Sequence, residues 1–221
     1  MNLTKEKTTY DTVLFDLDGT LLNTLDDLAD SVNYALRAKG YPTRTTEEVR
    51  RFIGNGVAVL MKRAVPEGTD QAKIDEALEC FRAHYKENMR NKTKPYDGII
   101  PLLEELKRRG IRTAIISNKY HDAVGQLARE EFPGLFDAAF GESERLRPKP
   151  APDIVNAAMD ALGAKKERTL YVGDSDTDGI TACNAGLFFV GVSWGFRDRD
   201  VLEEAGAGAV IDKPKELLAL L

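Results

Sequence analysis

Short runs of apolar and β-branched residues recur along the chain, and stretches with helical spacing of apolar residues separate them. Five runs are long enough to form buried strands: residues 12–15, 113–116, 169–172, 187–192 and 209–211. Runs without polar alternation are typical of strands that are covered on both faces of a parallel sheet. Amphipathic patterns at 102–106 and 154–162 lie between them. This alternation of strands and helices predicts a doubly wound, Rossmann-like α/β core.

The segment from residue 21 to residue 94 departs from that alternation, because it contains helical patterns and no convincing strand. Apolar residues at helical spacing run from Leu25 to Leu36. Further helical patterns cover residues 47–52, 57–65 and 71–90. We therefore predict an all-helical insert of residues 21–94 after the first strand, with residues 1–20 and 95–221 forming the α/β core.

Composition narrows the classes of function. The chain of 221 residues carries 31 Lys and Arg against 36 Asp and Glu, a formal net charge of −5, which argues against nucleic-acid binding. The longest uncharged run, residues 179–196, is too polar to span a membrane. Cys80 and Cys183 exclude a disulfide framework, and we expect both to be buried in a reducing compartment. No apolar stretch precedes Val13, so we expect no secretory leader and a cytoplasmic protein.

Polar clusters directly follow the three clearest predicted strands. They are Asp16-Leu17-Asp18-Gly19-Thr20, Ser117-Asn118-Lys119 and Gly173-Asp174-Ser175-Asp176-Thr177-Asp178. A fourth cluster, Arg147-Pro148-Lys149-Pro150, lies in the loop between the second and third of those strands. Parallel strands bring their carboxyl ends to one edge of a sheet, where ligands bind in open α/β folds. The four clusters are therefore predicted to form one site.

The predicted site combines carboxylates with a cation and hydrogen-bond donors. Its four carboxylates are those of Asp16, Asp18, Asp174 and Asp178. A hard cation with oxygen ligands, Mg²⁺ above all, would neutralise this charge. Ser117 and loop amides can hydrogen-bond a phosphate, on which Lys149 can place a positive charge. A carboxylate can attack phosphorus while a second carboxylic acid protonates the leaving oxygen, and Asp16 and Asp18 suit these two roles.

The four clusters, in this order, resemble the four signature motifs of the haloacid dehalogenase-like hydrolase superfamily, and the resemblance covers essentially the whole chain. The helical insert is similar to the small helical cap of that superfamily, which closes over the site and excludes water. Two further segments, Ile53-Gly54-Asn55-Gly56 with residues 59–64 and the segment 191–197, resemble phosphoglycolate phosphatases.

The resemblance implies a catalytic and a metal-binding role for the four aspartates. Asp16 would be the nucleophile that is phosphorylated during turnover, and Asp18 would be the general acid and base. Mg²⁺ would be held by the Asp16 carboxylate, the Asp18 backbone carbonyl and Asp174. Asp178 would hold the ion directly or through water.

The resemblance also implies which residues bind the substrate. Ser117 and the amide of Asn118 would bind the phosphoryl group. Lys149 would orient the nucleophile and offset charge. The loop Gly54-Asn55-Gly56 would be the part of the cap that faces the substrate.

These roles predict a Mg²⁺-dependent phosphomonoester hydrolase that acts through an aspartyl-phosphate on a small phosphorylated metabolite such as 2-phosphoglycolate. A sugar phosphomutase similar to β-phosphoglucomutase and a pyrophosphatase are alternatives, since the same motifs serve them. Asp18 argues against carbon–halogen and phosphonate chemistry, because those relatives lack this second acid. From another class, a non-catalytic phosphoaspartate signalling or binding module has similar carboxylates, but the helical insert disfavours it. Both a monomer and a homodimer stay open.

Overall fold

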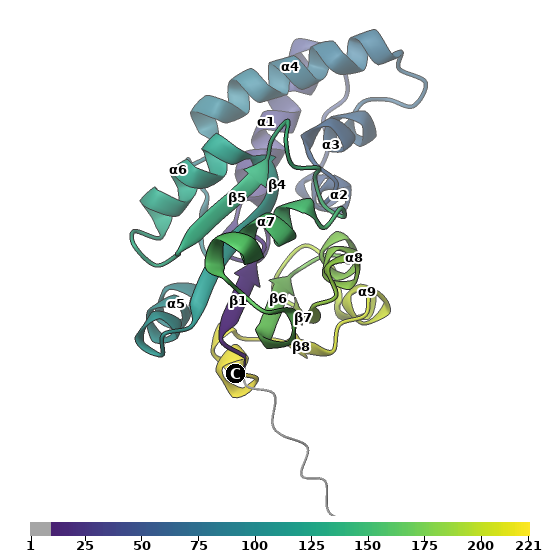
Figure 1. Cartoon of the computed structure of the whole chain (residues 1–221). Helices are drawn as coiled ribbons and strands as arrows, with labels where there is room; N and C mark the ends of the chain where they lie inside the picture. The colour runs from purple at the N-terminus through teal and green to yellow at the C-terminus, as the bar shows by residue number, and fades with distance from the viewer. Residues whose placement is uncertain (1–9) are drawn as a thin grey trace, which may run out of the picture.

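The computed structural model describes residues 10–221, and its centre is a six-stranded parallel sheet (Figure 1). In chain order the strands are β1 (Thr12–Phe15), β4 (Arg112–Tyr120), β5 (Ala138–Glu142), β6 (Thr169–Gly173), β7 (Phe188–Val192) and β8 (Ala209–Ile211). In space their order is β5-β4-β1-β6-β7-β8, with each neighbouring pair parallel. The chain winds outward on both sides of β1, which is where a doubly wound sheet forms its crevice. The predicted Rossmann-like α/β core is confirmed.

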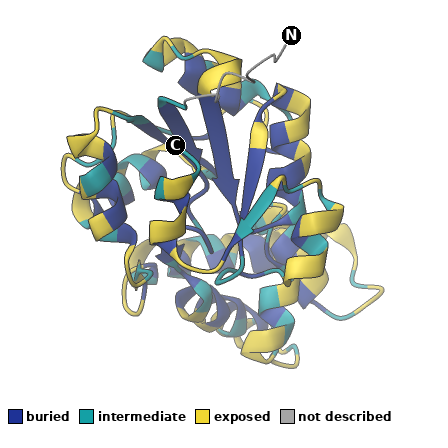
Figure 2. Ribbon diagram, turned by 90° about the horizontal axis from the view of Figure 1, so that it is seen from below, coloured by how far each residue is buried: buried dark blue, intermediate teal, exposed yellow. Residues whose placement is uncertain are grey.

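Helices cover both faces of this sheet, so that the central strands β1 and β6 are buried along their whole length (Figure 2). One face is covered by α5 (Ile99–Arg108), α6 (His121–Glu131) and the 3₁₀ helix η2 (Pro214–Ala219). The other face is covered by α7 (Asp153–Leu162), α8 (Asp176–Ala185) and α9 (Arg199–Glu204), and the short η1 (Lys166–Arg168) leads into β6. Val13 and Phe15 pack on the first face, and Leu14 between them packs on the second. Both faces need apolar side chains, which explains the uninterrupted apolar run of β1.

Four helices come between β1 and α5 and form a helical unit beside the core (top of Figure 1). They are α1 (Leu25–Ala38), α2 (Thr46–Phe52), α3 (Val57–Ala64) and α4 (Gln71–Asn88). The chain enters and leaves this unit side by side, because β2 (Leu22–Asn23) pairs antiparallel with β3 (Lys94–Pro95). The Asp27 carboxylate fastens the junction by accepting the backbone N–H groups of Lys92 at 3.0 Å and Thr93 at 2.8 Å.

Three details differ from the sequence-based expectations. β4 continues to Tyr120, because its pairing with β5 resumes there, so Ser117 lies within the strand and not after it. The apolar pattern does not predict β5, whose sequence Ala-Ala-Phe-Gly-Glu forms an only partly buried edge strand. The prediction of two buried cysteines is wrong, since Cys183 is exposed and Cys80 is partly exposed.

No helix within residues 10–221 is long and apolar enough to cross a membrane. The expectation of no secretory leader rests on the first residues of the chain, and residues 1–9 lie outside the described part. The described chain begins beside β6, where the Asp11 N–H donates to the Arg168 carbonyl at 3.0 Å.

Candidate active site

One pocket lies between the core and the helical unit, at the carboxyl ends of β1, β4 and β6. It contains about 640 Å³ of empty space, part of which is open to solvent. The core lines it with Asp16, Asp18, Ser117, Asn118, Lys119, Lys149, Asp174, Ser175, Phe196 and Arg197. The helical unit lines it with Leu28, Ile53, Gly54, Gly56, Val57 and Leu60. The structure thus brings residues of all four predicted clusters to one place.

The Lys149 ammonium lies between two carboxylates in this pocket. Its Nζ is 2.7 Å from Asp16 Oδ1 and 2.7 Å from Asp178 Oδ1, and its side chain is only 4% exposed. Asn118 fixes the loop that carries this lysine, because its Oδ1 accepts the Lys149 N–H at 2.7 Å and its Nδ2 donates to the Lys149 carbonyl at 3.1 Å. The Asn118 side chain is therefore occupied, and its backbone amide is the group that can face a phosphate.

Three buried carboxylates gather beside this lysine. One oxygen from each of Asp16, Asp174 and Asp178 lies within 4.8 Å of the other two. Burial and the charge of Asp178 raise the pKa of Asp16 well above its ordinary value and raise the pKa of Asp174 to about 7. When all three carboxyls are ionised, one ammonium leaves two negative charges uncompensated, and a single divalent cation would neutralise them. Because the donors are carboxylate oxygens, they fit a hard cation such as Mg²⁺.

The three carboxylates differ in the number of hydrogen bonds that they accept. Asp178 accepts four hydrogen bonds, from Lys149 at 2.7 Å, the Tyr171 hydroxyl at 3.0 Å, the Ser175 hydroxyl at 2.6 Å and the Ser175 N–H at 3.1 Å. Asp16 accepts one, from Lys149, within residues 10–221. Asp174 accepts the Phe196 N–H at 2.7 Å and a longer bond of 3.4 Å from the Thr20 hydroxyl. Asp16 and Asp174 are thus the freer ligands, and Asp178 fits a contact through water better than a direct one.

Asp18 lies apart from these three carboxylates and pairs with a cation to which sequence analysis assigns no role. The Nζ of Lys119 is 3.2 Å from Asp18 Oδ1 and 2.8 Å from the Tyr85 hydroxyl. Lys119 is the last residue of the predicted cluster Ser117-Asn118-Lys119 in β4, and its membership of that cluster is its only sequence signal. Tyr85 belongs to α4 and lies 34 positions from Lys119 along the chain, so no local pattern connects the two. A carboxyl group that lines the pocket two residues after Asp16 is well placed to exchange a proton with a bound ester.

The loop Gly54-Asn55-Gly56, between α2 and α3, approaches the site with its two glycines. Gly54 and Gly56 line the pocket and have φ angles of +122° and +81°, a region that residues with a side chain rarely adopt. Asn55 is not among the lining residues. Its side-chain amide donates to the Thr177 hydroxyl at 3.0 Å, which ties the helical unit to α8. Two of the three loop residues are therefore at the pocket, and the third holds the loop in place.

Arg197 is a second lining residue to which sequence analysis assigns no role. Its guanidinium donates to the backbone carbonyls of Arg50 at 3.1 Å and Ile53 at 2.5 Å, and it pairs with Asp176 at 3.3 Å. A helix C-terminus leaves such carbonyls without intrahelical partners, so Arg197 caps α2 from the core. These partners are 147 and 144 positions away in sequence, which explains why the pattern of the chain does not predict them.

Comparisons with known proteins agree with this geometry. The family model described as haloacid dehalogenase-like hydrolase matches residues 13–192. A phosphoglycolate phosphatase of Mesorhizobium japonicum is 37% identical over 197 residues, which are 86% of this chain and 86% of that protein. A crystal structure from Lactobacillus delbrueckii subsp. bulgaricus has a TM-score of 0.92 at 34% identity and covers 96% of this chain and 99% of that chain. The structure of a predicted phosphoglycolate phosphatase from Haemophilus somnus has a TM-score of 0.87 at 29% identity, with coverages of 96% and 97%.

Proposed function

Because the chain belongs to the haloacid dehalogenase-like hydrolase family and is a phosphatase, we propose that it is a Mg²⁺-dependent phosphomonoesterase with Asp16 as the nucleophile. The environment of Asp16 carries this proposal. Its carboxylate is buried at the end of β1, one of its oxygens is held by Lys149 at 2.7 Å, and Ser117 lines the same pocket. The alternative of a non-catalytic phosphoaspartate module is set aside, since the chain is an enzyme.

The proposed reaction has two steps, which Asp16 and Asp18 share. In the first, an Asp16 oxygen bonds to phosphorus, the bond from phosphorus to the ester oxygen breaks, and Asp18 gives its proton to that leaving oxygen. In the second, ionised Asp18 takes a proton from water while the water oxygen bonds to phosphorus, and the bond to Asp16 breaks. The Lys119 ammonium, 3.2 Å away, would hold the Asp18 carboxyl in place in both steps.

The phosphoryl oxygens would be held by the Ser117 hydroxyl and the Asn118 backbone amide, while Lys149 balances their charge. Asp16 and Asp174 would hold Mg²⁺ through carboxylate oxygens and Asp18 through its backbone carbonyl, with Asp178 acting through water. When bound, the ion would neutralise the clustered carboxylates and the charge of the phosphate.

We further propose that residues 21–94 form a cap domain and that residues 1–20 and 95–221 form the hydrolase core. The four helices of the insert, the paired strands β2 and β3 at its base and the pocket beneath it support this division. A substrate in the pocket would be enclosed between the two parts. Such enclosure excludes water from the first step, which is where water would compete with Asp16.

For the substrate, we propose a small phosphorylated metabolite, with 2-phosphoglycolate as the first candidate. The relative from Mesorhizobium japonicum is named a phosphoglycolate phosphatase, and it matches along most of its length. Sugar phosphates, as in a phosphomutase, and pyrophosphate are the competing substrates. We propose a cytoplasmic location, which agrees with the unbridged state of Cys80 and Cys183.

The test is phosphate release with Mg²⁺ from 2-phosphoglycolate, pyrophosphate, several sugar phosphates and nucleoside monophosphates, each beside the Asp16→Asn variant. We expect no turnover by Asp16→Asn, whose side chain keeps nearly the same volume, and a circular dichroism spectrum like that of the wild type. A kcat/KM for 2-phosphoglycolate about tenfold above the rest, equivalent to roughly 1.4 kcal/mol, would support the narrow assignment. Near-normal activity of Asp16→Asn would overturn the nucleophile assignment.

A further inference from the structure

Lys119 is a buried cation with hydrogen-bonding capacity beyond its two partners. Its side chain is 9% exposed, and its Nζ contacts Asp18 Oδ1 at 3.2 Å and the Tyr85 hydroxyl at 2.8 Å. The Tyr85 ring also packs against the ammonium, with the Nζ 4.7 Å from the ring centroid. An ammonium has three N–H donors, of which the hydrogen bond to the Tyr85 hydroxyl uses one, whereas the contact with Asp18 is an ion pair. Because Lys119 lines the pocket, a further donor is available to a bound molecule.

The other two cations that line the pocket, Lys149 and Arg197, have other partners. Lys149 serves the carboxylates of Asp16 and Asp178 on the nucleophile side. Arg197 donates hydrogen bonds to two backbone carbonyls at the end of α2 and pairs with Asp176. Of the three cations that line the pocket, Lys119 is thus the one beside Asp18, the proposed proton donor to the leaving oxygen. The leaving group of the ester must lie on that side.

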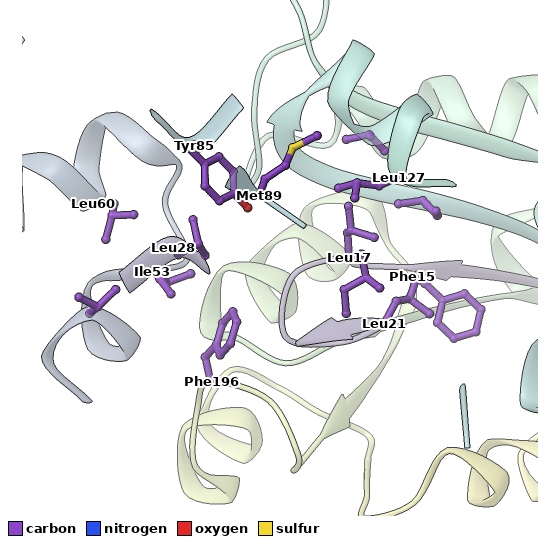
Figure 3. Packing of buried hydrophobic residues seen from close by; sticks show 14 of the residues in the cluster. Phe15, Leu17, Leu21, Leu28, Ile53, Leu60, Tyr85, Met89, Leu127 and Phe196 are labelled. Atoms are coloured by element: carbon purple, nitrogen blue, oxygen red, sulfur yellow. The ribbon is translucent and has the colours of Figure 1, made fainter. Parts of the chain in front are cut away.

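The wall that the helical unit presents to the leaving group is apolar. Its side chains are those of Leu28, Ile53, Val57 and Leu60, and three of them lie together opposite Phe196 (Figure 3). The hydroxyl groups of a sugar placed against this wall would lose their hydrogen bonds to water without replacement. A short leaving group that carries its polar atoms at one end, toward Lys119, would keep hydrogen bonds for those atoms.

We propose that Lys119, held in place by Tyr85, binds a carboxylate of the leaving group and so makes the enzyme selective for phosphate esters of short hydroxy acids. This inference rests on the proposed phosphatase reaction and adds the residue that selects its substrate. The carboxylate lies next to the ester oxygen in such a molecule, so one ammonium can contact both Asp18 and the substrate. Lys119 is then a specificity-determining residue, whereas Ser117 and Lys149 bind the phosphate that every substrate shares.

The test compares 2-phosphoglycolate with its amide, in which a neutral group of the same size replaces the carboxylate. The kcat/KM for both esters is measured for the wild type, Lys119→Met, Lys119→Arg and the control Lys62→Met, which removes an exposed lysine of α3. We expect the wild type and Lys62→Met to prefer the acid. In Lys119→Met the acid should lose roughly 10- to 100-fold more than the amide, because a hydrogen bond between charged groups is lost. Lys119→Arg should restore part of the preference.

The outcomes separate this inference from the proposed function. Equal losses on the acid and the amide in Lys119→Met would mean that Lys119 only positions Asp18, and would overturn the inference while the phosphatase reaction stands. If the wild type had nearly the same kcat/KM for the acid as for the amide, the inference would also be overturned, without recourse to any variant. Release of phosphate from none of the esters tested would overturn the proposed function itself.

Tyr85→Phe provides a second variant, in case Lys119→Met does not fold. It removes the hydroxyl that holds Lys119 and keeps the ring, so the fold should be retained. We expect a smaller fall in the same ratio of acid to amide. An unchanged ratio would exclude Tyr85 from the recognition of the carboxylate.

Discussion

In the proposed reaction, Asp18 is an acid in one step and a base in the next. Its side chain is 18% exposed, which leaves it accessible to a leaving oxygen or to water. The Lys119 ammonium, 3.2 Å away, holds the carboxyl beside the pocket in which the ester would lie. The same carboxyl is therefore within reach of the leaving oxygen in the first step and of water in the second.

This dual role predicts how the Asp18→Asn variant depends on the leaving group. Asparagine is unable to transfer the proton, and general-acid help is worth about 10²- to 10⁴-fold in rate. An alkoxide needs that help and p-nitrophenolate needs little, so an alkyl phosphate should lose at least roughly tenfold more than p-nitrophenyl phosphate. Single-turnover release of the leaving group measures the first step alone. Asp26→Asn, on the exposed first turn of α1, is the control, and equal losses on both esters would contradict the acid role.

The raised pKa of Asp174, about 7, links Mg²⁺ binding to pH. A carboxyl whose pKa is higher in the folded than in the unfolded protein costs stability when it ionises. The metal-free protein should therefore become less stable as pH rises from about 4 through 7, and Mg²⁺ should offset this cost. We expect the rise in Tm on adding Mg²⁺ to be larger at about pH 8 than at about pH 6, in thermal scans at matched ionic strength.

Asp174→Asn is the matched variant for this linkage. It removes the carboxylate charge that lowers the stability of the metal-free protein. It also removes one of the proposed ligands of the ion. The metal-free variant should be at least as stable as the wild type at about pH 8, and Mg²⁺ should raise its Tm little. A Mg²⁺ response in the variant as large as that of the wild type would exclude Asp174 as a ligand.

At the level of single elements, burial on both faces decides which strands the sequence predicts. β1 and β6 are buried along their whole length, so both sets of alternating side chains are apolar and the pattern is clear. β5 is an edge strand with one fully buried residue, Gly141, and its run contains no β-branched residue. The apolar pattern likewise does not predict the end of β4, because the polar residues Ser117 and Lys119 line the site and also continue the strand.

The packing of α8 against the end of α9 gives a prediction about Gly179. A Cβ on Gly179 would lie 2.5 Å from the Ala205 carbonyl oxygen and 2.6 Å from the Ala205 Cβ. Alanine has a helix propensity better than glycine by about 1 kcal/mol, but overpacking against backbone costs roughly 1–3 kcal/mol. We expect Gly179→Ala to be net destabilising and to lower Tm by a few degrees.

Gly125 in α6 is the matched control for this substitution. The nearest atom to its Cβ would be the end of the flexible Arg129 side chain, at 3.3 Å. Gly125→Ala should therefore raise stability by about 0.5–1 kcal/mol. If both variants were stabilised equally, the close approach of α8 and α9 would not be what requires glycine at 179.

At the scale of the whole molecule, sequence predicts the motifs of the site and misses the contacts that join its parts. Each predicted cluster follows a strand or lies in a loop between strands, so the topology of a parallel sheet is enough to bring them together. The contacts of Tyr85 with Lys119 and of Arg197 with α2 each join the helical unit to the core. They depend on how the helical unit packs against the core, which the periodicity of apolar residues along the chain does not predict.

Arg197 therefore gives a prediction for the molecule as a whole. Without its guanidinium, the carbonyls at the end of α2 lose their cap, and the loop that carries Gly54 and Gly56 is less firmly held over the pocket. In Arg197→Met we expect faster hydrogen exchange of the backbone amides in residues 50–57. We also expect KM to rise by roughly tenfold, with a smaller change in kcat, because a loop that is less firmly held over the pocket leaves the binding-competent state less populated.

The matched control for this prediction is Arg199→Met, because Arg199 lies two positions away and forms ion pairs within the core, with Asp212 at 2.6 Å and Glu203 at 3.9 Å. It removes the same positive charge from the same region of the molecule, so any general electrostatic effect on an anionic substrate is common to both variants. Arg197→Met additionally removes the link to α2 and a cation that lines the pocket, and hydrogen exchange separates these two effects. A rise in KM with unchanged exchange in residues 50–57 would mean that Arg197 contacts the substrate and does not hold the end of α2.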